Sequence, residues 1–304
     1  MEYPLVSIIS VNYDHPEVTC ALLLSLRKIS YPSVEIIVLD NASPKDDPSV
    51  IKKSFPEVIF IQSKENLGFA GGNNLAIRQT KGKYILLLNN DTEVDPGFLE
   101  PLVAKLESDK RIGAVSPKIK FFFNPDTIQY SGQAPINPYT IRSHGFGFGA
   151  KDHGQFDKDT PTSFVHGAAM MVSREVLQNV GLMAECYFLY YEELDWGSRI
   201  TRAGYQLWYV HNSTVFHKES ISTGKFSPLK TYYMNRARIL YLRRNVSGLT
   251  FIIAVLYQLF VSIPKNALTF LLRGNPGHFK AYNRAVMWHA KKMFNKDIHS
   301  NPVL

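Results

Sequence analysis

Cysteine is scarce in this chain: Cys20 and Cys186 are the only two among 304 residues. Two cysteines so far apart supply neither a disulfide framework nor the paired spacing of a zinc knuckle. The first residues also lack the basic segment and cleavage site of a signal peptide, and run directly into a strand-like stretch. The sequence therefore indicates a reducing compartment, and we expect a cytoplasmic location.

Acidic residues are almost missing from the end of the chain. Residues 225–304 contain 13 Lys and Arg but only one acid, Asp297, whereas residues 1–224 contain 21 basic and 25 acidic residues. With 45% hydrophobic residues, the chain is long enough to bury a sizeable core. The uneven charge predicts two parts: a folded body, residues 1–224, and a basic tail, residues 225–304, that meets an anionic surface.

Apolar runs of strand length alternate with helical spacing through most of the body. Each parallel strand needs a crossover helix, so the alternation predicts an α/β fold with a doubly wound, mostly parallel sheet. The predicted strands are residues 5–11, 34–40, 58–63, 84–88, 112–119, 164–173 and 214–217, and the predicted helices are 17–29, 48–55, 97–108, 174–181 and 192–203.

Polar residues follow three of these strands, and we expect them to line a ligand cleft, because the carboxyl ends of parallel strands share one edge. The uniformly apolar strand at 84–88 is typical of a strand buried on both faces. Carboxylates after it suit Mg²⁺ or Mn²⁺, which in turn holds a diphosphate. The alternative is an Asp/Asn turn before a helix that begins at Pro96. The polar residues are Ser10, Asn12, Asp40, Asn41, Asn90 and Asp91.

A glycine-rich stretch at residues 66–72 is predicted to be a loop that enters a helix ending near Gly82. Its glycine spacing matches neither the phosphate loop nor the dinucleotide fingerprint. The stretch is either a tight strand-to-helix turn or a contact to a nucleotide sugar. The residues available for that contact are Asn66, Gly68, Asn73 and Asn74.

Residues 121–162 are irregular and rich in Gly, Pro and aromatic residues, as in active-site loops and lids. His144, His153 and His166 lack ligand spacing, and we interpret them as ordinary loop or cleft side chains. His217, at the end of the 214–217 strand, is either another such side chain or a metal ligand beside the carboxylates.

Three acids, Glu192, Glu193 and Asp195, open a predicted helix after the aromatic stretch 187–191. Acids in a first turn complement the helix dipole, and pairing with Arg199 would explain them further. Alternatively, burial raises a carboxyl's pKa from an ordinary value of about 4.3 and creates a base for an attacking hydroxyl. Glu192 and Glu193 point about 100° apart around the helix, so they do not share one role.

Six segments, in this order and spacing, resemble the family 2 glycosyltransferases. The resemblance spans residues 6–219 and is similar in detail to the rhamnosyltransferase-like enzymes of bacterial cell-surface polysaccharide assembly. It implies a GT-A fold, a nucleotide-diphosphate sugar donor, a divalent cation and an inverting displacement. The segments are VSIISVNY, VLDNAS, ENLGFAGGNN, LLLNNDTEVDPGFL, GAAMMVSREVL and FLYYEELDWGSRITRAGY.

On the donor side, the resemblance implies roles for three residues. Asp40 matches the residue that recognises the nucleotide base. Asp91 matches the last acid of the family's D-x-D-type motif, which binds the metal and the diphosphate. Asn89 replaces the first acid of that motif. His217 matches a histidine that joins the metal, Mg²⁺ or Mn²⁺, in some members.

On the acceptor side, the resemblance implies a catalytic base at Glu193, where the family usually has aspartate. Trp196 lies where the acceptor is commonly contacted, and Glu192 and Asp195 support the site. Inversion needs one base on the face opposite the leaving diphosphate and a cation for its charge, and the sequence offers Glu193 and Asp91. A retaining hydrolase would instead need two carboxyls around the sugar.

The basic tail combines positive charge with long apolar runs. We predict an amphipathic helix at 228–245 and an apolar segment at 249–263 that residues 264–266 interrupt. Because a span needs about 20 apolar residues, we favour a helix pair lying in the membrane interface over a true span. The aliphatic runs between the charges favour lipid over nucleic acid as the anionic partner, on the inner face of the cell membrane.

These observations favour an inverting glycosyltransferase that moves a sugar from a nucleotide-diphosphate donor to a glycan acceptor, expected to be lipid-linked. dTDP-rhamnose is the first expected donor and a UDP-sugar the next. The alternative is a catalytically weak sugar- or nucleotide-binding scaffold, suggested by Asn89 and by Glu193 in place of aspartate. A nucleotidyltransferase is disfavoured, because no lysine-rich phosphate loop follows the first strand.

Overall fold

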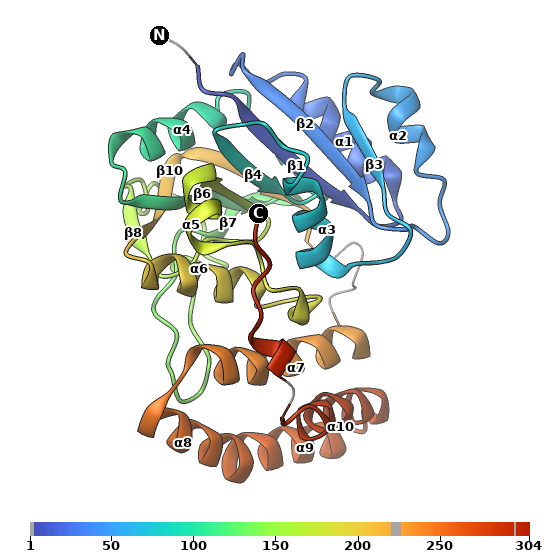
Figure 1. The fold of residues 1–304 in the computed structure, drawn as a ribbon, viewed down its shortest axis with the longest axis vertical. Helices are drawn as coiled ribbons and strands as arrows, with labels where there is room; N and C mark the ends of the chain where they lie inside the picture. Colours follow the sequence, from blue (N-terminus) through green and yellow to red (C-terminus); the bar gives the residue numbers. More distant parts are fainter. Residues whose placement is uncertain (1–2, 220–225, 295) are drawn as a thin grey trace.

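The computed structural model of the chain describes residues 3–219, 226–294 and 296–304. The predicted boundary between residues 224 and 225 lies outside these ranges. One sheet forms the body, in the order β3-β2-β1-β4-β9-β6-β10-β5, with β7 paired to β6 and β8 to β10 (Figure 1). The strands are β1 Val6–Asn12, β2 Val34–Asp40, β3 Ile59–Gln62, β4 Tyr84–Leu88, β5 Thr92–Val94, β6 Ile112–Phe121, β7 Asn124–Tyr130, β8 Thr160–Thr162, β9 Ala169–Ser173 and β10 Gln206–His217.

The sheet is mixed but mostly parallel, as the alternation of strands and helices predicts. Parallel pairing joins β1 to β2 and β4, β2 to β3, and β6 to β10. Strand β9 runs antiparallel between β4 and β6, and β5 runs antiparallel to β10. The predicted strand at 164–173 is too long, because the chain turns before Ala169. There the His166 ring nitrogen Nδ1 accepts a hydrogen bond of 3.1 Å from the Ala168 backbone N–H.

Helices cover both faces of the sheet, and each face has its own apolar core. Residues of β4 alternate between the two: Leu86 packs with α1, α2 and α4, whereas Ile85 packs with α3, α5 and α6. This double burial is the reason for the uniformly apolar β4. The helices are α1 Pro16–Leu26, α2 Ser49–Ser54, α3 Gly68–Ile77, α4 Leu99–Ser108, α5 Arg174–Val180 and α6 Glu192–Arg202.

The glycine-rich stretch is not the predicted loop, because α3 already begins at Gly68 and ends at Ile77. A Cβ atom on Gly72 would lie 3.3 Å from side-chain atoms of Val11 and of Asn41. The small residues therefore allow the first turns of the helix to pack directly against the end of β1. This tight packing overrides the low helix propensity of glycine.

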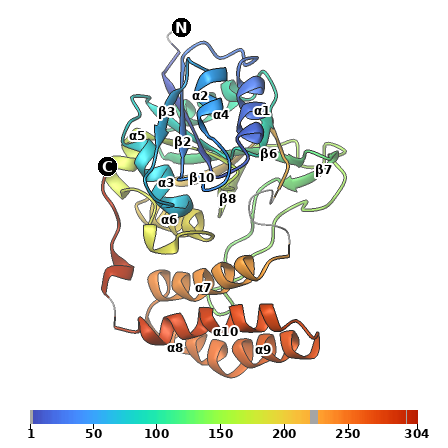
Figure 2. The same ribbon diagram turned by 90° about the vertical axis from the view of Figure 1, so that its right-hand side faces the viewer.

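The C-terminal part forms a helical layer below the body (Figure 2). It contains α7 Pro228–Asn245, α8 Gly248–Tyr257, α9 Ile263–Leu272 and α10 Pro276–Lys291, with a π-helical turn between α8 and α9. The predicted interruption at 264–266 is wrong, because Gly248–Leu272 is one continuous helix of 25 residues. The π turn precedes Pro264, which lies in the first turn of α9, so the missing N–H of proline is accommodated.

The helical layer and the chain end are both fixed to the body. Ala237, Leu240 and Tyr241 of α7 share an apolar cluster with Tyr187 and Tyr191, which precede α6. The chain end then returns to the body, where the Leu182 backbone N–H donates to the Pro302 carbonyl at 2.8 Å. Helix α7 therefore belongs to the helical layer and also packs against the body.

Candidate active site

A cavity of about 980 Å³ opens at the carboxyl ends of β1, β2 and β4 and reaches α7. Polar residues after all three strands line it, as expected for an open α/β sheet. Of the predicted site residues, the cavity lining contains Asn41, Asn66, Gly68, Asn73, Asn90, Asp91, Glu192, Glu193 and His217, but not Ser10, Asn12, Asp40, Asp195 or Trp196.

Asp91 and His217 meet at the end of the sheet because β5 pairs antiparallel with β10, which sets His217 opposite Thr92. The His217 Nε2 atom lies 3.0 Å from Asp91 Oδ1. The His217 Nδ1 atom lies 2.8 Å from the side-chain oxygen of Gln129 on β7, which fixes the ring. With the proton on Nδ1, the Nε2 lone pair and the Asp91 carboxylate face the same point.

This pair fits a divalent cation. Both side chains are nearly buried and both line the cavity. A carboxylate oxygen and a neutral imidazole nitrogen are ligands for Mn²⁺, and Mg²⁺ would rely more on the carboxylate. The Gln129 contact is the outer hydrogen bond that orients ligating histidines. Asp91 and His217 are therefore the residues that would hold the metal.

Asp40 and Asn12 form a buried network beneath the cavity. The Asn12 side-chain amide donates to Asp40 Oδ1 at 2.9 Å, and Thr19 donates to the Asn12 oxygen at 2.7 Å. Ser43 donates to Asp40 through its backbone N–H at 3.2 Å and through its hydroxyl at 2.5 Å. The network fixes the loop after β2, and the recognition of a nucleotide base by Asp40 stays a prediction.

Three predicted donor contacts, Asn41, Asn66 and Gly68, lie together at the start of α3. The Asn41 amide donates to Asn66 Oδ1 at 3.2 Å and to the Gly68 carbonyl at 3.0 Å. Gly68 has a φ of +70°, and a Cβ atom there would lie 2.3 Å from the Phe188 carbonyl oxygen. The close approach requires glycine and joins the donor side of the cavity to the segment before α6.

Glu192 and Glu193 begin α6 at the cavity wall. Phe188, Tyr190 and Tyr191 before them have positive φ values of 68°, 69° and 70°. Such backbone conformations cost free energy and persist where packing enforces them. The Oε2 atoms of both glutamates are buried and accept no hydrogen bond from the residues that the structure describes. Two unsatisfied carboxylate oxygens in one cavity mark a site where a ligand supplies the missing partner.

Burial controls the electrostatics of the two glutamates. It raises the pKa of Glu193 from 4.5 to about 7. Burial, reinforced by the charge of Glu193, raises the pKa of Glu192 well above its usual value. The pKa of Glu193, about 7, allows this carboxyl to exchange a proton near neutral pH, which is the property of a general base.

Glu193 and His217 both lie close to one short segment, residues 164–168. A Cβ atom on Gly167 would lie 3.5 Å from Glu193 Oε1, so the glutamate rests directly against this glycine. The neighbouring His166 ring lies 6.2 Å from that of His217. Burial lowers the pKa of His166 to about 3 and keeps it neutral. Residues of this segment thus line the cavity together with Glu193, Asp91 and His217.

Asp195 and Trp196 turn away from the cavity, and the expected contact of Trp196 with the acceptor is wrong. Trp196 is 1% exposed, and its indole N–H donates to the Gly181 carbonyl at 2.9 Å, so it cannot contact an acceptor. Asp195 accepts from Arg199 Nε at 3.0 Å and from Arg244 Nε at 2.9 Å. Burial alone would raise the pKa of Asp195, but these arginines lower it. Both residues hold α6 in place from the side that faces away from the cavity.

Ser10 is also outside the cavity. Its side chain is 1% exposed within β1, and its hydroxyl has no partner among the residues that the structure describes. Ser10 precedes the strand end by two residues, so its side chain shares a face with Asn12 and not with Val11, which lines the cavity. Direct binding of the donor by Ser10 is therefore not supported by its position.

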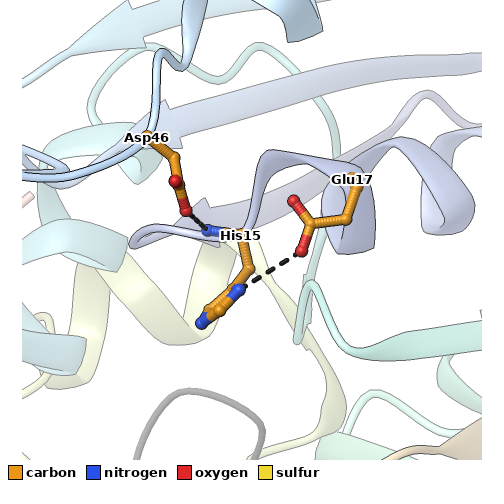
Figure 3. Close-up of side chains that lie close together, drawn as sticks. All are labelled: His15, Glu17 and Asp46. Carbon is orange, nitrogen blue, oxygen red and sulfur yellow. Dashed lines mark hydrogen bonds and ion pairs between the residues drawn. The ribbon is translucent and has the colours of Figure 1, made fainter.

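A second group of titratable residues lies on the surface (Figure 3). The Asp46 carboxylate accepts from the His15 backbone N–H at 3.0 Å, and Glu17 lies 3.2 Å from His15 Nδ1. His15 has a φ of 52°, so these hydrogen bonds stabilise an unusual turn before α1. The two contacts account for the group without an ion.

Sequence reasoning missed the part of the cavity wall that comes from distant segments. The irregular region contributes Gln129, Gln133 and Arg142, and α7 contributes Tyr233 and Arg238. Only the glycine- and aromatic-rich composition of 121–162 hinted at a role. For the first helix of the basic tail, the alternative to a membrane element is packing against the body, and α7 does line the cavity.

The fold and the cavity define a GT-A protein. A mannosyltransferase from Pyrobaculum calidifontis in complex with GDP-Man and Mn²⁺ aligns over 98% of this chain and 83% of its own, with a TM-score of 0.59 and 16% identity. GalNAc-T7 with UDP, GalNAc and Mn²⁺ aligns over 97% of this chain and 58% of its own, with a TM-score of 0.67 and 15% identity. At these identities the likeness establishes the fold.

The chain belongs to Glycosyl transferase family 2, whose profile matches residues 7–181, and it is a glycosyltransferase. The N-acetylglucosaminyl-diphospho-decaprenol L-rhamnosyltransferase of Mycobacterium tuberculosis is 24% identical over 72% of this chain and 77% of its own. A low-salt glycan biosynthesis hexosyltransferase of Haloferax volcanii is 25% identical over 75% of this chain and 72% of its own. The family resemblance of the sequence motifs is thereby confirmed.

Proposed function

We propose that this glycosyltransferase inverts the sugar that it transfers from a nucleotide-diphosphate donor to a lipid-linked glycan acceptor of cell-surface polysaccharide. One observation carries the proposal: Glu193, Asp91 and His217 line the same cavity. A base for the acceptor and ligands for the donor's diphosphate are thus available in one enclosed space.

In the proposed reaction, Glu193 takes the proton of the acceptor hydroxyl while that oxygen attacks the anomeric carbon. The new glycosidic bond forms on the face opposite the diphosphate, and the bond from the anomeric carbon to the diphosphate oxygen breaks with its electron pair. Asp91 and His217 would hold a divalent cation, which would supply positive charge to the departing diphosphate. The raised pKa of Glu193 suits proton transfer near neutral pH.

For the donor we propose dTDP-rhamnose first and a UDP-sugar next. The rhamnosyltransferase relative from Mycobacterium tuberculosis supports the sugar, and the word diphospho-decaprenol in its name supports a lipid-linked acceptor. An O-antigen biosynthesis protein of Myxococcus xanthus, 26% identical over 72% of this chain, supports a role in surface glycan synthesis. In that relative the match covers only 18% of its length.

We also propose that the helical layer binds the inner face of the cell membrane from the cytoplasm. Helix Gly248–Leu272 is long and apolar enough to cross a membrane, and its most apolar stretch is only 11% buried. Because α10 packs beside α9, an in-plane helix pair fits better than a span. The exposed large side chains are Leu249, Ile252, Ile253, Leu256, Leu259, Phe260, Val261, Leu268, Leu271 and Leu272.

The test is release of nucleoside diphosphate from a panel of donors with Mg²⁺, Mn²⁺ or a chelator. We expect release that one donor supports best, and loss of release with the chelator. Glu193→Gln should abolish release but keep donor binding, whereas Glu175→Gln, an exposed carboxyl outside the cavity, should change neither. Donor binding with no release for any donor and acceptor would favour the scaffold alternative.

A further inference from the structure

Two arginines line the acceptor half of the cavity without an acidic partner. Arg142 comes from the segment between β7 and β8, and Arg238 comes from α7. Neither has a carboxylate within ion-pair distance among the residues that the structure describes. By contrast, Arg199 and Arg244 of the same region are paired with Asp195.

Arg238 and the backbone next to Arg142 are fixed relative to the base. Arg238 Nε donates to the Tyr191 hydroxyl at 3.3 Å, and that hydroxyl donates to the Ile141 carbonyl at 3.2 Å. Tyr191 directly precedes Glu192, and Ile141 directly precedes Arg142. One tyrosine therefore connects both arginines to the start of α6, where the catalytic carboxyl lies.

The same arginines adjoin the apolar helical layer. Burial raises the pKa of Tyr282 on α10, and a hydrogen bond from Asn266 on α9 and the charges of Arg238 and Arg142 oppose this rise. The loop that carries Arg142 also touches the π turn, because Gln258 donates to the Tyr139 carbonyl at 3.3 Å. The arginines thus lie between the base and the helix proposed to enter the membrane.

The wall around them is apolar on the side of the helical layer. Ile136, Leu229 and Met234 line this part of the cavity. A guanidinium group binds phosphate oxygens through two parallel hydrogen bonds, and two such groups match a diphosphate. A prenyl chain leaving that diphosphate would meet apolar side chains before it reaches the lipid.

We infer that Arg142 and Arg238 bind the diphosphate that links the acceptor glycan to its lipid, an assignment that rests on the function proposed above. The acceptor then enters with its lipid along the helical layer, its diphosphate on the arginines and its sugar hydroxyl at Glu193. The charge of the arginines selects diphosphate-linked acceptors over neutral glycosides.

Binding tests this inference without catalysis. Farnesyl diphosphate serves as the probe, with saturating UDP and Mg²⁺ to fill the donor site, and farnesol as the neutral analogue. We expect Arg142→Gln/Arg238→Gln to raise the calorimetric Kd for farnesyl diphosphate about 100-fold. Binding of farnesol should not change. Arg238→Lys, which keeps the charge, should retain part of the affinity.

The matched control is Lys265→Gln/Arg273→Gln, which removes two exposed charges of the helical layer outside the cavity and should leave the Kd unchanged. Equal Kd values for wild type and the Arg142/Arg238 variant, no binding by the wild type, or equally tight binding of inorganic diphosphate would each overturn the inference. Melting temperatures exclude misfolding of the variants. Failure to release nucleoside diphosphate would contradict the proposed function separately.

Discussion

The two faces of α6 carry acids of opposite character only two residues apart. Glu193 faces the cavity, its Oε2 atom is unpaired among the described residues, and burial raises its pKa to about 7. Asp195 faces the body and the C-terminal helices, where Arg199, Arg244 and Asn245 bond to its carboxylate and its pKa is lowered.

Within one short motif, the hydrogen-bonding partners of each carboxylate distinguish the acid that lines the cavity from the acid that stabilises the fold. A buried carboxylate that accepts hydrogen bonds from two arginines, an asparagine and a tyrosine is stabilised as an anion and does not exchange a proton near neutral pH. A buried carboxylate without partners is held at a cost in stability, and such a cost is typical of functional sites. The predictions below test each side of this contrast.

The largest effect is expected for Glu193→Gln. Loss of a general base lowers kcat by about 1,000-fold, because water must then accept the proton of the attacking hydroxyl. The measurement is steady-state nucleoside diphosphate release with donor and acceptor, with Glu175→Gln as the exposed control. A variant that keeps more than a tenth of wild-type kcat would show that Glu193 is not the base.

On the other face, Asp195→Asn should unfold the protein more easily without removing its chemistry. The substitution leaves Arg199 and Arg244 buried without their carboxylate, and breaking such a pair costs about 3–5 kcal/mol. Denaturant unfolding measures the loss, and activity per folded molecule should stay within a few-fold of wild type. Unchanged stability would contradict the structural role of Asp195.

The stability of Glu193→Gln should differ from wild type in a pH-dependent way. The folded protein holds the Glu193 proton up to about pH 7, whereas the unfolded chain releases it near 4.5. The free energy of unfolding of the wild type therefore decreases as pH rises through this interval, whereas that of the glutamine variant lacks this decrease. At pH 8 we expect the variant to be more stable by about 3 kcal/mol, measured by denaturant unfolding at pH 5 and pH 8.

The smallest effect is expected for Glu192→Gln. Burial raises the pKa of Glu192 well above its usual value and so favours its neutral form, and an amide of the same shape replaces that form. We therefore expect kcat within about 3-fold of wild type. A loss as large as that of Glu193→Gln would assign the two glutamates a shared role.

Much of the fold could be predicted because it depends on local patterns. The strands at 34–40 and 84–88 match β2 and β4, since short runs dominated by apolar residues have few alternatives inside an α/β sheet. The start of α3 could not be predicted, because small residues that pack a helix closely look like a loop in sequence. The π turn before Pro264 likewise depends on packing that no local pattern reveals.

In the site too, residues in local motifs could be predicted and residues from distant segments could not. Glu193, Asp91 and His217 were identified through the ordered motifs, and they do line one cavity. The partners of Asp195 were out of reach, because Arg244 follows it by 49 residues and meets it only through the packing of α7. Arg142 and Arg238 were missed for the same reason: their segments reach the cavity only in the folded chain.

The pH dependence of kcat/KM for nucleoside diphosphate release tests the contrast between Glu193 and Asp195 most directly. The account predicts that the wild-type rate rises through about pH 7 as Glu193 loses its proton. Asp195→Asn should keep this rise, and Glu193→Gln should lose it. A rise that persists in Glu193→Gln, or one that disappears in Asp195→Asn, would contradict the assignment of the base.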